Sequence, residues 1–168
     1  IGTLYLWFSF IMLFIGGGMA MVIRAELFQP GLQIVQPEFF NQMTTNHGLI
    51  MVFGVIMPAF VGLANWMLPM QIGAPDMALP RLNNLSFWLL PMAFGILIST
   101  LFMPEGGPNF GWTFYAPLST TYAPSTVNFF IFSVHVMGVS SILGSINIIT
   151  TIFNLSLIHI SEPTRQAE

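Results

Sequence analysis

Apolar residues dominate four long segments of the chain, and polar residues gather between them. The segments without a charged side chain are 4–23, 49–72, 85–103 and 127–155. Each supplies the roughly 20 apolar residues that a helix needs to cross about 30 Å of hydrocarbon. The pattern therefore predicts four membrane-spanning helices, at about residues 3–25, 46–72, 84–104 and 126–154.

Polar residues and turn formers interrupt the apolar pattern three times, which predicts three loops. The first covers residues 26–45, and we expect the polar run NQMTTN at its end to cap the second helix. The second, 73–84, contains Pro75 and Pro80, which oppose a continuous helix. The third, 104–125, is rich in glycine, proline and aromatic residues, as is typical of a segment at a membrane interface. Because successive spans alternate in direction, the first and third loops share one face.

Composition narrows the class of protein. Of 168 residues, 55% are hydrophobic and 5% are charged, whereas a soluble domain carries about a quarter charged residues. The chain lacks the charge to cover a soluble surface, and its slightly acidic balance gives no indication of nucleic-acid binding. It has no cysteine, which excludes disulfides, zinc–thiolate sites and iron–sulfur clusters within this chain. The sequence predicts an all-α membrane protein.

The two ends of the chain carry separate expectations. Ile1 is not an initiator methionine and lies a few residues before the first span, so we expect the chain to be a piece of a longer protein. At the other end, LSLIHISEPTR (155–165) reads like the translated end of a sequencing-library adapter. We therefore expect a functional part over 1–154 and a non-native tail over 155–168, and we take candidate sites from the former.

A histidine, His47, opens the apolar second span in the stretch TTNHGLIMVFG. A histidine at a membrane interface is often an inert hydrogen-bonding group, but an imidazole is also the usual axial ligand of heme iron in electron transfer. Arg24, Trp112 and Tyr115 belong to the same end of the bundle, where a cation can hold polar heme groups. His135 lies in the same half of the membrane, so spacing alone also allows a self-contained bis-histidine heme bundle.

A second set of polar residues belongs to the opposite end. Asp76 sits in the proline-bounded loop, and helix spacing places Asn65 and Asn83 near it. In the fourth span, Ser140 and Asn147 are spaced i, i+7 and share one stripe of the helix. Inside a membrane such a stripe needs partners or water. Hydrogen bonds between helices would satisfy it, and so would a water-filled proton path, which a carboxylate at the mouth favours.

Five longer stretches carry a family resemblance. Together IRAELFQPG, TTNHGLIMVFG, NWMLPMQIGAPDMALPRLNNLSFWLLP, GWTFYAPL and GVSSILGSINIITT resemble cytochrome c oxidase subunit I, of the heme–copper oxidase superfamily. The resemblance covers residues 1–154, and IGAPDMALPRLNNLSFWLLP is its most specific part. The stretches LQIVQPEFFNQMTTNHG and STTYAPS are closer to bacterial than to mitochondrial members. Without the resemblance, a b-type cytochrome bundle and a non-redox transporter or structural bundle remain as alternatives.

The resemblance implies roles for the residues at the His47 end. His47 matches an axial ligand of low-spin heme a, Arg24 a hydrogen-bond donor to the formyl group of that heme, and Trp112 a neighbour of its propionates. Glu26, with the backbone of Gln29 and Gly31, matches a calcium or sodium site on the outer face.

The resemblance also implies a role for the opposite end. Asp76 matches the mouth of the D channel, through which the family takes up protons. The residues that match its lining are Asn65, Asn83, Tyr5, Ser140, Ser141 and Asn147. His135 matches no ligand in that pattern, which disfavours the bis-histidine bundle.

The resemblance finally implies a setting for the chain. It would form the first four of twelve helices of subunit I in a bacterial cytoplasmic membrane, in contact with lipid, the remainder of subunit I and subunits II and III. The complete enzyme would take electrons from cytochrome c, reduce dioxygen to water at a second heme and a copper centre, and pump protons. The ligands of that oxygen-binding heme and of copper would lie beyond this fragment, so we do not expect the fragment alone to be active.

The charge distribution gives a testable orientation. Arg81 marks the second loop as cytoplasmic if Arg24 belongs to the interior of the bundle. We predict that residues 73–84 are cytoplasmic and that 26–45 and 104–125 are outside. Topology reporters fused after Asn84 and after Pro117 should report the inside and the outside, respectively, and an external signal after Asn84 would contradict the prediction.

Overall fold

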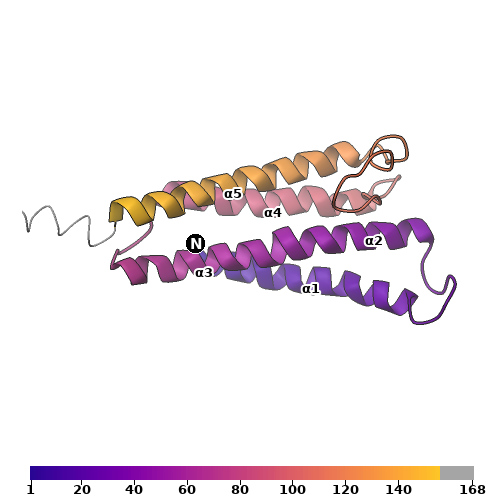
Figure 1. Cartoon of the computed structure of the whole chain (residues 1–168), viewed down its shortest axis with the longest axis horizontal. Helices are drawn as coiled ribbons and strands as arrows, with labels where there is room; N and C mark the ends of the chain where they lie inside the picture. The colour runs from indigo at the N-terminus through magenta and orange to yellow at the C-terminus, as the bar shows by residue number, and fades with distance from the viewer. Residues whose placement is uncertain (156–168) are drawn as a thin grey trace, which may run out of the picture.

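The computed structural model describes residues 1–155, and within them the secondary structure is entirely helical (Figure 1). The helices are α1 (Gly2–Glu26), α2 (Pro37–Leu49), the π-helix η1 (Ile50–Ile56), α3 (Met57–Ile72), α4 (Pro80–Ser99), the short 3₁₀-helix η2 (Thr100–Phe102) and α5 (Val127–Leu155). The predicted non-native tail falls outside the described residues, apart from Leu155 at the end of α5.

Four helical segments are long and apolar enough to cross a membrane, which confirms the predicted fold class. They are Gly2–Glu26, the continuous stretch Pro37–Ile72, Pro80–Phe102 and Val127–Leu155. The second segment runs through α2, η1 and α3 without a break, although its seven central residues have π-helical geometry.

The second and third spans begin earlier than the sequence predicts. The second begins at Pro37 rather than at residue 46, with proline in the first turn and Glu38 beside it. Proline at the first helical position and an acidic residue in the first turn both favour a helix start. The run NQMTTN therefore lies inside α2, and its predicted capping role is wrong, since Gln36 is the N-cap and makes no side-chain capping bond. α4 likewise begins at Pro80.

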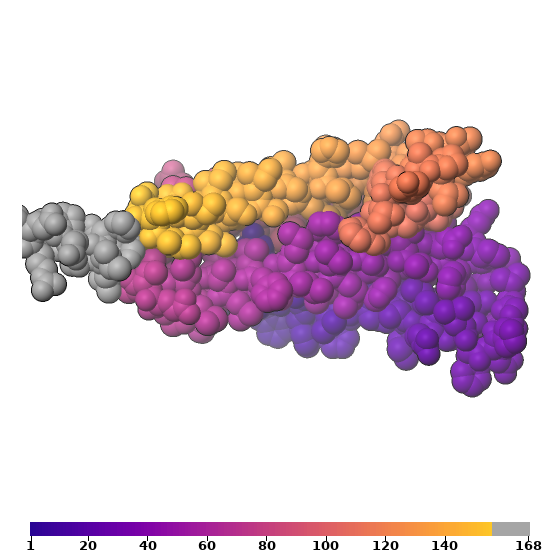
Figure 2. Space-filling model, in the orientation of Figure 1, coloured from indigo at the N-terminus to yellow at the C-terminus, as the bar shows by residue number. Residues whose placement is uncertain are grey.

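The helices pack as two pairs, α1 against α2–η1–α3 and α4 against α5 (Figure 1). Residues 27–36 and 103–126 connect helices at one end of the bundle, and residues 73–79 connect them at the other. The space-filling view shows the 103–126 loop lying against the surface formed by α2 (Figure 2). As predicted, the first and third loops share an end.

Two glycines let the backbones of α1 and α3 approach each other closely. A Cβ atom on Gly2 would lie 2.9 Å from the carbonyl oxygen of Gly62, and one on Gly62 would lie 3.0 Å from the carbonyl oxygen of Gly2. Backbone cannot move aside as a side chain can, so both positions require glycine. This contact brings the N-terminal end of α1 against α3 and places Tyr5 inside the bundle, where it is 2% exposed.

The loop 103–126 is tied together at its base. A carboxylate oxygen of Glu105 accepts the Ser125 N–H at 2.5 Å, and the Thr126 hydroxyl donates to the Gly106 carbonyl at 2.6 Å. The backbone and side-chain hydrogen bonds from Ser125 hold the pKa of Glu105 below its usual value. The ring of Phe114 stacks on Phe130 of α5 at a centroid distance of 4.5 Å. The loop is therefore an ordered cap on α4 and α5.

The loop 27–36 is closed by one carboxylate at the end of α1. The two oxygens of Glu26 accept hydrogen bonds from the backbone N–H groups of Gln33, Ile34 and Val35, at 2.9, 2.6 and 3.0 Å. The side chain is 5% exposed. Three N–H groups that converge on one carboxylate fix the return of the chain toward α2.

Glu26→Ala should loosen this loop, because three backbone N–H groups lose their acceptor. We expect hydrogen–deuterium exchange of residues 33–35 to accelerate at least tenfold, about 1.4 kcal/mol of lost protection. The matched control is Glu38→Ala, which removes an exposed carboxylate from the first turn of α2. Equal exchange in the wild type and Glu26→Ala would contradict the closing role of Glu26.

Candidate functional site

His47 is held by the backbone of the neighbouring helix. It lies in the last turn of α2, is half-buried, and its Nδ1 is 2.9 Å from the carbonyl oxygen of Gly16 in α1. A carbonyl only accepts, so Nδ1 carries the proton in this bond, and in the neutral form of the ring Nε2 keeps its lone pair. A Cβ on Gly16 would lie 2.8 Å from Met51 Sδ and 3.0 Å from Ile50 Cγ2, so a side chain there would have to displace these two side chains of η1. A neutral imidazole with one nitrogen anchored is the arrangement that metal-ligating histidines use.

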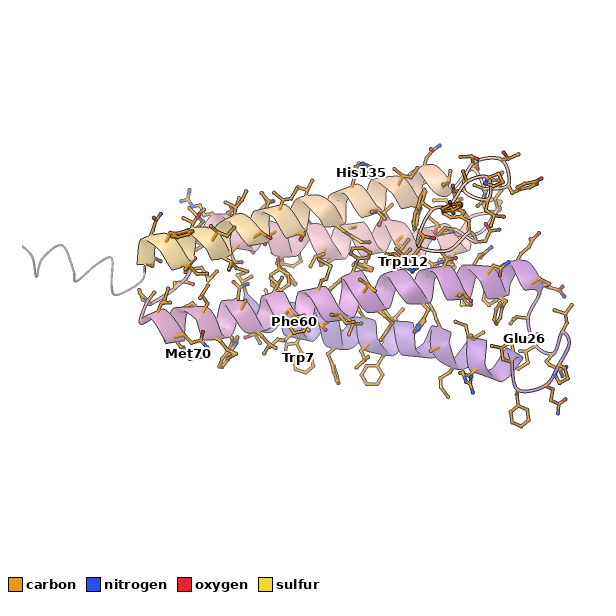
Figure 3. The ribbon with its side chains drawn as sticks, viewed as in Figure 1. Trp7, Glu26, Phe60, Met70, Trp112 and His135 are labelled. Atoms are coloured by element: carbon orange, nitrogen blue, oxygen red, sulfur yellow. The ribbon has the colours of Figure 1, made fainter. Side chains whose placement is uncertain are left out.

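Trp112 is the predicted neighbour that the structure brings to the helix of His47. It follows Gly111 in the 103–126 loop, and Figure 3 shows it beside the ribbon of α2. A Cβ on Gly48 would lie 3.7 Å from Trp112 Cδ1, so the indole packs against the bare backbone of Gly48. The remainder of the indole is open, with 56% of the residue exposed.

Arg24 and His135 are not brought into contact with His47. Arg24 lies in the last turn of α1 with an exposed side chain. Within the described residues it therefore does not belong to the interior of the bundle, which was the condition for using Arg81 as the cytoplasmic marker. His135 is exposed on α5, and its Nδ1 lies 2.8 Å from the carbonyl oxygen of Ile131, one turn earlier in its own helix. Figure 3 shows His135 at the edge of the bundle away from α2. The two histidines do not face each other, which argues against the bis-histidine bundle.

The predicted cation-site residues lie together in the 27–36 loop. Glu26, Gln29 and Gly31 line an open groove of about 500 Å³. The carboxylate of Glu26 already accepts three N–H groups, and Gln29 and Gly31 are exposed. Within the described part of the chain, no three His, Cys, Asp or Glu residues form a metal-binding group. A cation here would rely on backbone carbonyls and a shared carboxylate.

At the opposite end, buried hydroxyl groups connect three helices. The Tyr5 hydroxyl of α1 and the Ser86 hydroxyl of α4 lie 2.7 Å apart, and the Ser140 hydroxyl of α5 donates to the Ser86 carbonyl at 2.6 Å. The Ser86 hydroxyl also donates to the carbonyl of Asn83. Sequence reasoning missed Ser86, although its position three residues after Asn83 places both on one face of α4.

Two buried asparagine side chains at the same end each have one polar atom without a hydrogen-bond partner. The Asn83 side-chain amide donates to Asn65 Oδ1 at 2.5 Å, and Asn147 Oδ1 accepts the Leu79 N–H at 2.9 Å. Asn83 Oδ1 and Asn147 Nδ2 are buried without a protein partner. Buried polar atoms are nearly always hydrogen-bonded, so these two atoms indicate sites for water.

A small, partly open cavity adjoins the hydroxyl groups of Tyr5 and Ser140. A cavity of about 30 Å³ is lined by Tyr5, Phe53, Met57, Pro58, Val61, Leu90, Met137, Ser140, Ser141 and Gly144. That volume is enough for a water molecule, and Tyr5, Ser140 and Ser141 offer it polar partners. The cavity and the unpartnered Nδ2 of Asn147 follow the stripe that the sequence predicts on α5, and the unpartnered Oδ1 of Asn83 belongs to α4.

Asp76 lies on the exposed side of the 73–79 loop. Its Oδ1 accepts the N–H of the next residue, Met77, at 2.7 Å, and the following N–H group, that of Ala78, donates to Thr151 Oγ1 at 3.0 Å. Asn147 and Thr151 of α5 thus anchor the loop that carries Asp76. Asp76 is exposed, while the backbone N–H groups of Ala78 and Leu79 after it donate to the buried side chains of Thr151 and Asn147.

Comparisons with known proteins agree with the sequence resemblance. The family profile described as "Cytochrome C and Quinol oxidase polypeptide I" matches residues 1–165. The chain is 46% identical over 154 residues to a probable cytochrome c oxidase subunit 1-alpha of Streptomyces avermitilis, which covers 90% of this chain and 27% of that protein. It is 45% identical over 157 residues to cytochrome c oxidase subunit 1 of Synechocystis, covering 94% of this chain and 28% of that protein.

A third relative, cytochrome c oxidase subunit 1 of Corynebacterium diphtheriae, is 44% identical over 154 residues, again 27% of its length. The chain thus spans about a quarter of the curated relatives that it matches. On the profile match and these identities, the chain belongs to the family of cytochrome c and quinol oxidase polypeptide I.

Proposed function

We propose that the full-length protein containing this chain is a terminal respiratory oxidase, which reduces dioxygen to water with electrons from cytochrome c and pumps protons. This chain contributes one axial ligand of low-spin heme a and the entrance half of the proton path. The observation that carries the proposal is the bond between His47 Nδ1 and the Gly16 carbonyl. It leaves Nε2 as the only ring nitrogen of His47 with a lone pair for iron.

The residues at the His47 end fit a heme. His47 would supply the axial nitrogen, and Trp112 would flank the group from the 103–126 loop. Arg24 would reach it from α1, on whose exposed side its guanidinium lies. When bound, the heme accepts and passes on single electrons. The chain's own contribution is to fix the imidazole tautomer through Gly16 and to leave space beside Gly48.

The residues at the opposite end fit a proton path. Asp76 collects protons from the cytoplasmic side, and its charge attracts them into the bundle. From there, water bound at Asn83 Oδ1, at Asn147 Nδ2 and in the cavity beside Tyr5 would pass them along the hydroxyl groups of α4 and α5. Support comes from the buried, unpartnered amide atoms, since hydrogen bonding between helices alone would have satisfied them.

The setting of the protein follows from the same proposal. The chain would lie in the bacterial cytoplasmic membrane, against lipid, the remainder of subunit I and subunits II and III, with the 73–79 loop in the cytoplasm. The oxygen-binding heme and the copper centre would be held by residues outside this chain. A calcium or sodium ion near Glu26, Gln29 and Gly31 completes the proposal on the outer face.

Replacing His47 by Ala in the full-length subunit should abolish the absorbance band of the low-spin heme, because the iron loses its nitrogen ligand. The matched control is His135→Ala, which removes an exposed imidazole from α5 and should leave the band intact. Spectra of the two purified variants decide the assignment. A normal low-spin band with normal turnover in His47→Ala would refute it.

Asp76→Asn should slow steady-state oxygen reduction at least tenfold, about 1.4 kcal/mol in barrier, with the heme spectrum unchanged. Asparagine keeps the oxygen that accepts the Met77 N–H, so the loop retains its geometry and only the charge is lost. Proton pumping should fall with the rate. Oxygen-electrode turnover and proton ejection measure both quantities.

Glu38→Gln serves as the control for Asp76→Asn, because it removes an exposed carboxylate at the other end of the bundle. A purely structural Asp76, which accepts one turn hydrogen bond, would give a near-normal Asp76→Asn enzyme. Wild-type turnover with normal proton ejection in that variant would therefore defeat the channel interpretation.

A further inference from the structure

Thr45 links α2 to the loop that covers it. It lies two residues before His47 and is 2% exposed. Its hydroxyl donates to the Asn41 carbonyl at 2.8 Å and accepts the backbone N–H of Gly111 at 3.0 Å. The first bond orients the hydroxyl along the helix, and this orientation turns a lone pair toward the loop.

Gly111 delivers the next residue, Trp112, to α2. Its φ of +83° lies in the left-handed region, which glycine adopts without strain. Thr45 and Gly48 are spaced i, i+3 and therefore share one face of α2. On that face the Gly111 N–H meets the Thr45 hydroxyl, and the indole of Trp112 meets the backbone of Gly48.

The rest of the contact between α2 and this loop is close packing. At the Gly106–Gly107 turn, Cβ atoms would collide with Gln42 and come within 3.4 Å of the Asn46 side chain. The side chain of Asn46 donates to the Gln42 carbonyl of its own helix, and its Oδ1 is buried without a protein partner. Among the described residues, the Thr45–Gly111 bond is the hydrogen bond between α2 and this loop.

We propose that Thr45 is a positioning residue: its hydroxyl fixes the Gly111 N–H and thereby sets the place of the Trp112 indole against Gly48, the residue that follows His47. The inference rests on the proposed role of His47 as a heme ligand. An indole ring and its N–H near an iron-ligating imidazole change the polarity and hydrogen bonding that set the reduction potential of the heme. Thr45 thus influences the reduction potential of the heme without contacting it.

The test compares Thr45→Val with Thr45→Ser in the full-length oxidase. Valine keeps the shape but leaves the Gly111 N–H without an acceptor, whereas serine keeps the hydroxyl. We expect hydrogen–deuterium exchange over 110–113 to accelerate at least fivefold in Thr45→Val. The midpoint potential and absorbance maximum of the low-spin heme should shift in the same variant. Both readouts should stay at wild-type values in Thr45→Ser.

Thr44→Val is the matched control. The Thr44 hydroxyl makes the same backward bond, to the Phe40 carbonyl at 3.0 Å, but the residue is exposed. It should leave exchange and the heme spectrum unchanged. Faster exchange in Thr45→Val with an unshifted heme would overturn the positioning role, and so would unchanged exchange.

A second variant covers the case in which Thr45→Val fails to assemble. Gly111→Ala meets no side chain within van der Waals contact except Thr113 Oγ1 at 4.0 Å, so its effect comes from strain at φ +83°. It should reproduce the heme shift, and a wild-type spectrum in assembled Gly111→Ala overturns the proposal. Failure of the heme assignment itself is recognised separately, because His47→Ala then keeps its low-spin band.

Discussion

Polar groups inside this bundle have to form hydrogen bonds with one another, because the lipid around four apolar spans offers none. The bonds that result connect the two helix pairs. Tyr5 of α1 reaches Ser86 of α4, and Asn65 of α3 accepts from Asn83 of α4. Two helix pairs that would otherwise meet only through apolar contacts are thus held in one register at the end where Asp76 enters.

At the other end, two glycine residues expose backbone groups to the interior of the bundle. Gly16 exposes a carbonyl to His47, and Gly48 exposes backbone to Trp112. In both places the backbone, which cannot change rotamer, is the partner. An imidazole fixed in this way has one orientation and one tautomer, which is the preorganisation that a ligand for a large planar cofactor requires. Among the described residues, the buried hydroxyl groups at this end, such as those of Thr45 and Thr126, donate to backbone carbonyls and do not bond to one another.

The sequence predicted the four spans, the sharing of ends by the loops and the buried stripe of Ser140 and Asn147, because each follows from a period of the helix or from spacing along it. It did not predict that α2 starts at Pro37, since the polar run before His47 resembles a cap more than a helix interior. The roles of Ser86 and Thr45 were not predicted, for a different reason. A lone hydroxyl residue carries no periodic signal, and its importance depends on a partner from another element, Tyr5 or Gly111.

The π-helix η1 separates His47 from Asn65 along one continuous span. In an uninterrupted α-helix these two residues, 18 positions apart, would stand on the same face after about five turns of 3.6 residues. A π-helix has wider turns and shifts the angular register of everything that follows it. His47 therefore turns to Gly16 of α1, while Asn65 turns to Asn83 of α4. The two halves of the span are thus offset in rotation about the helix axis, so that each half presents its polar side chain to a different neighbouring helix.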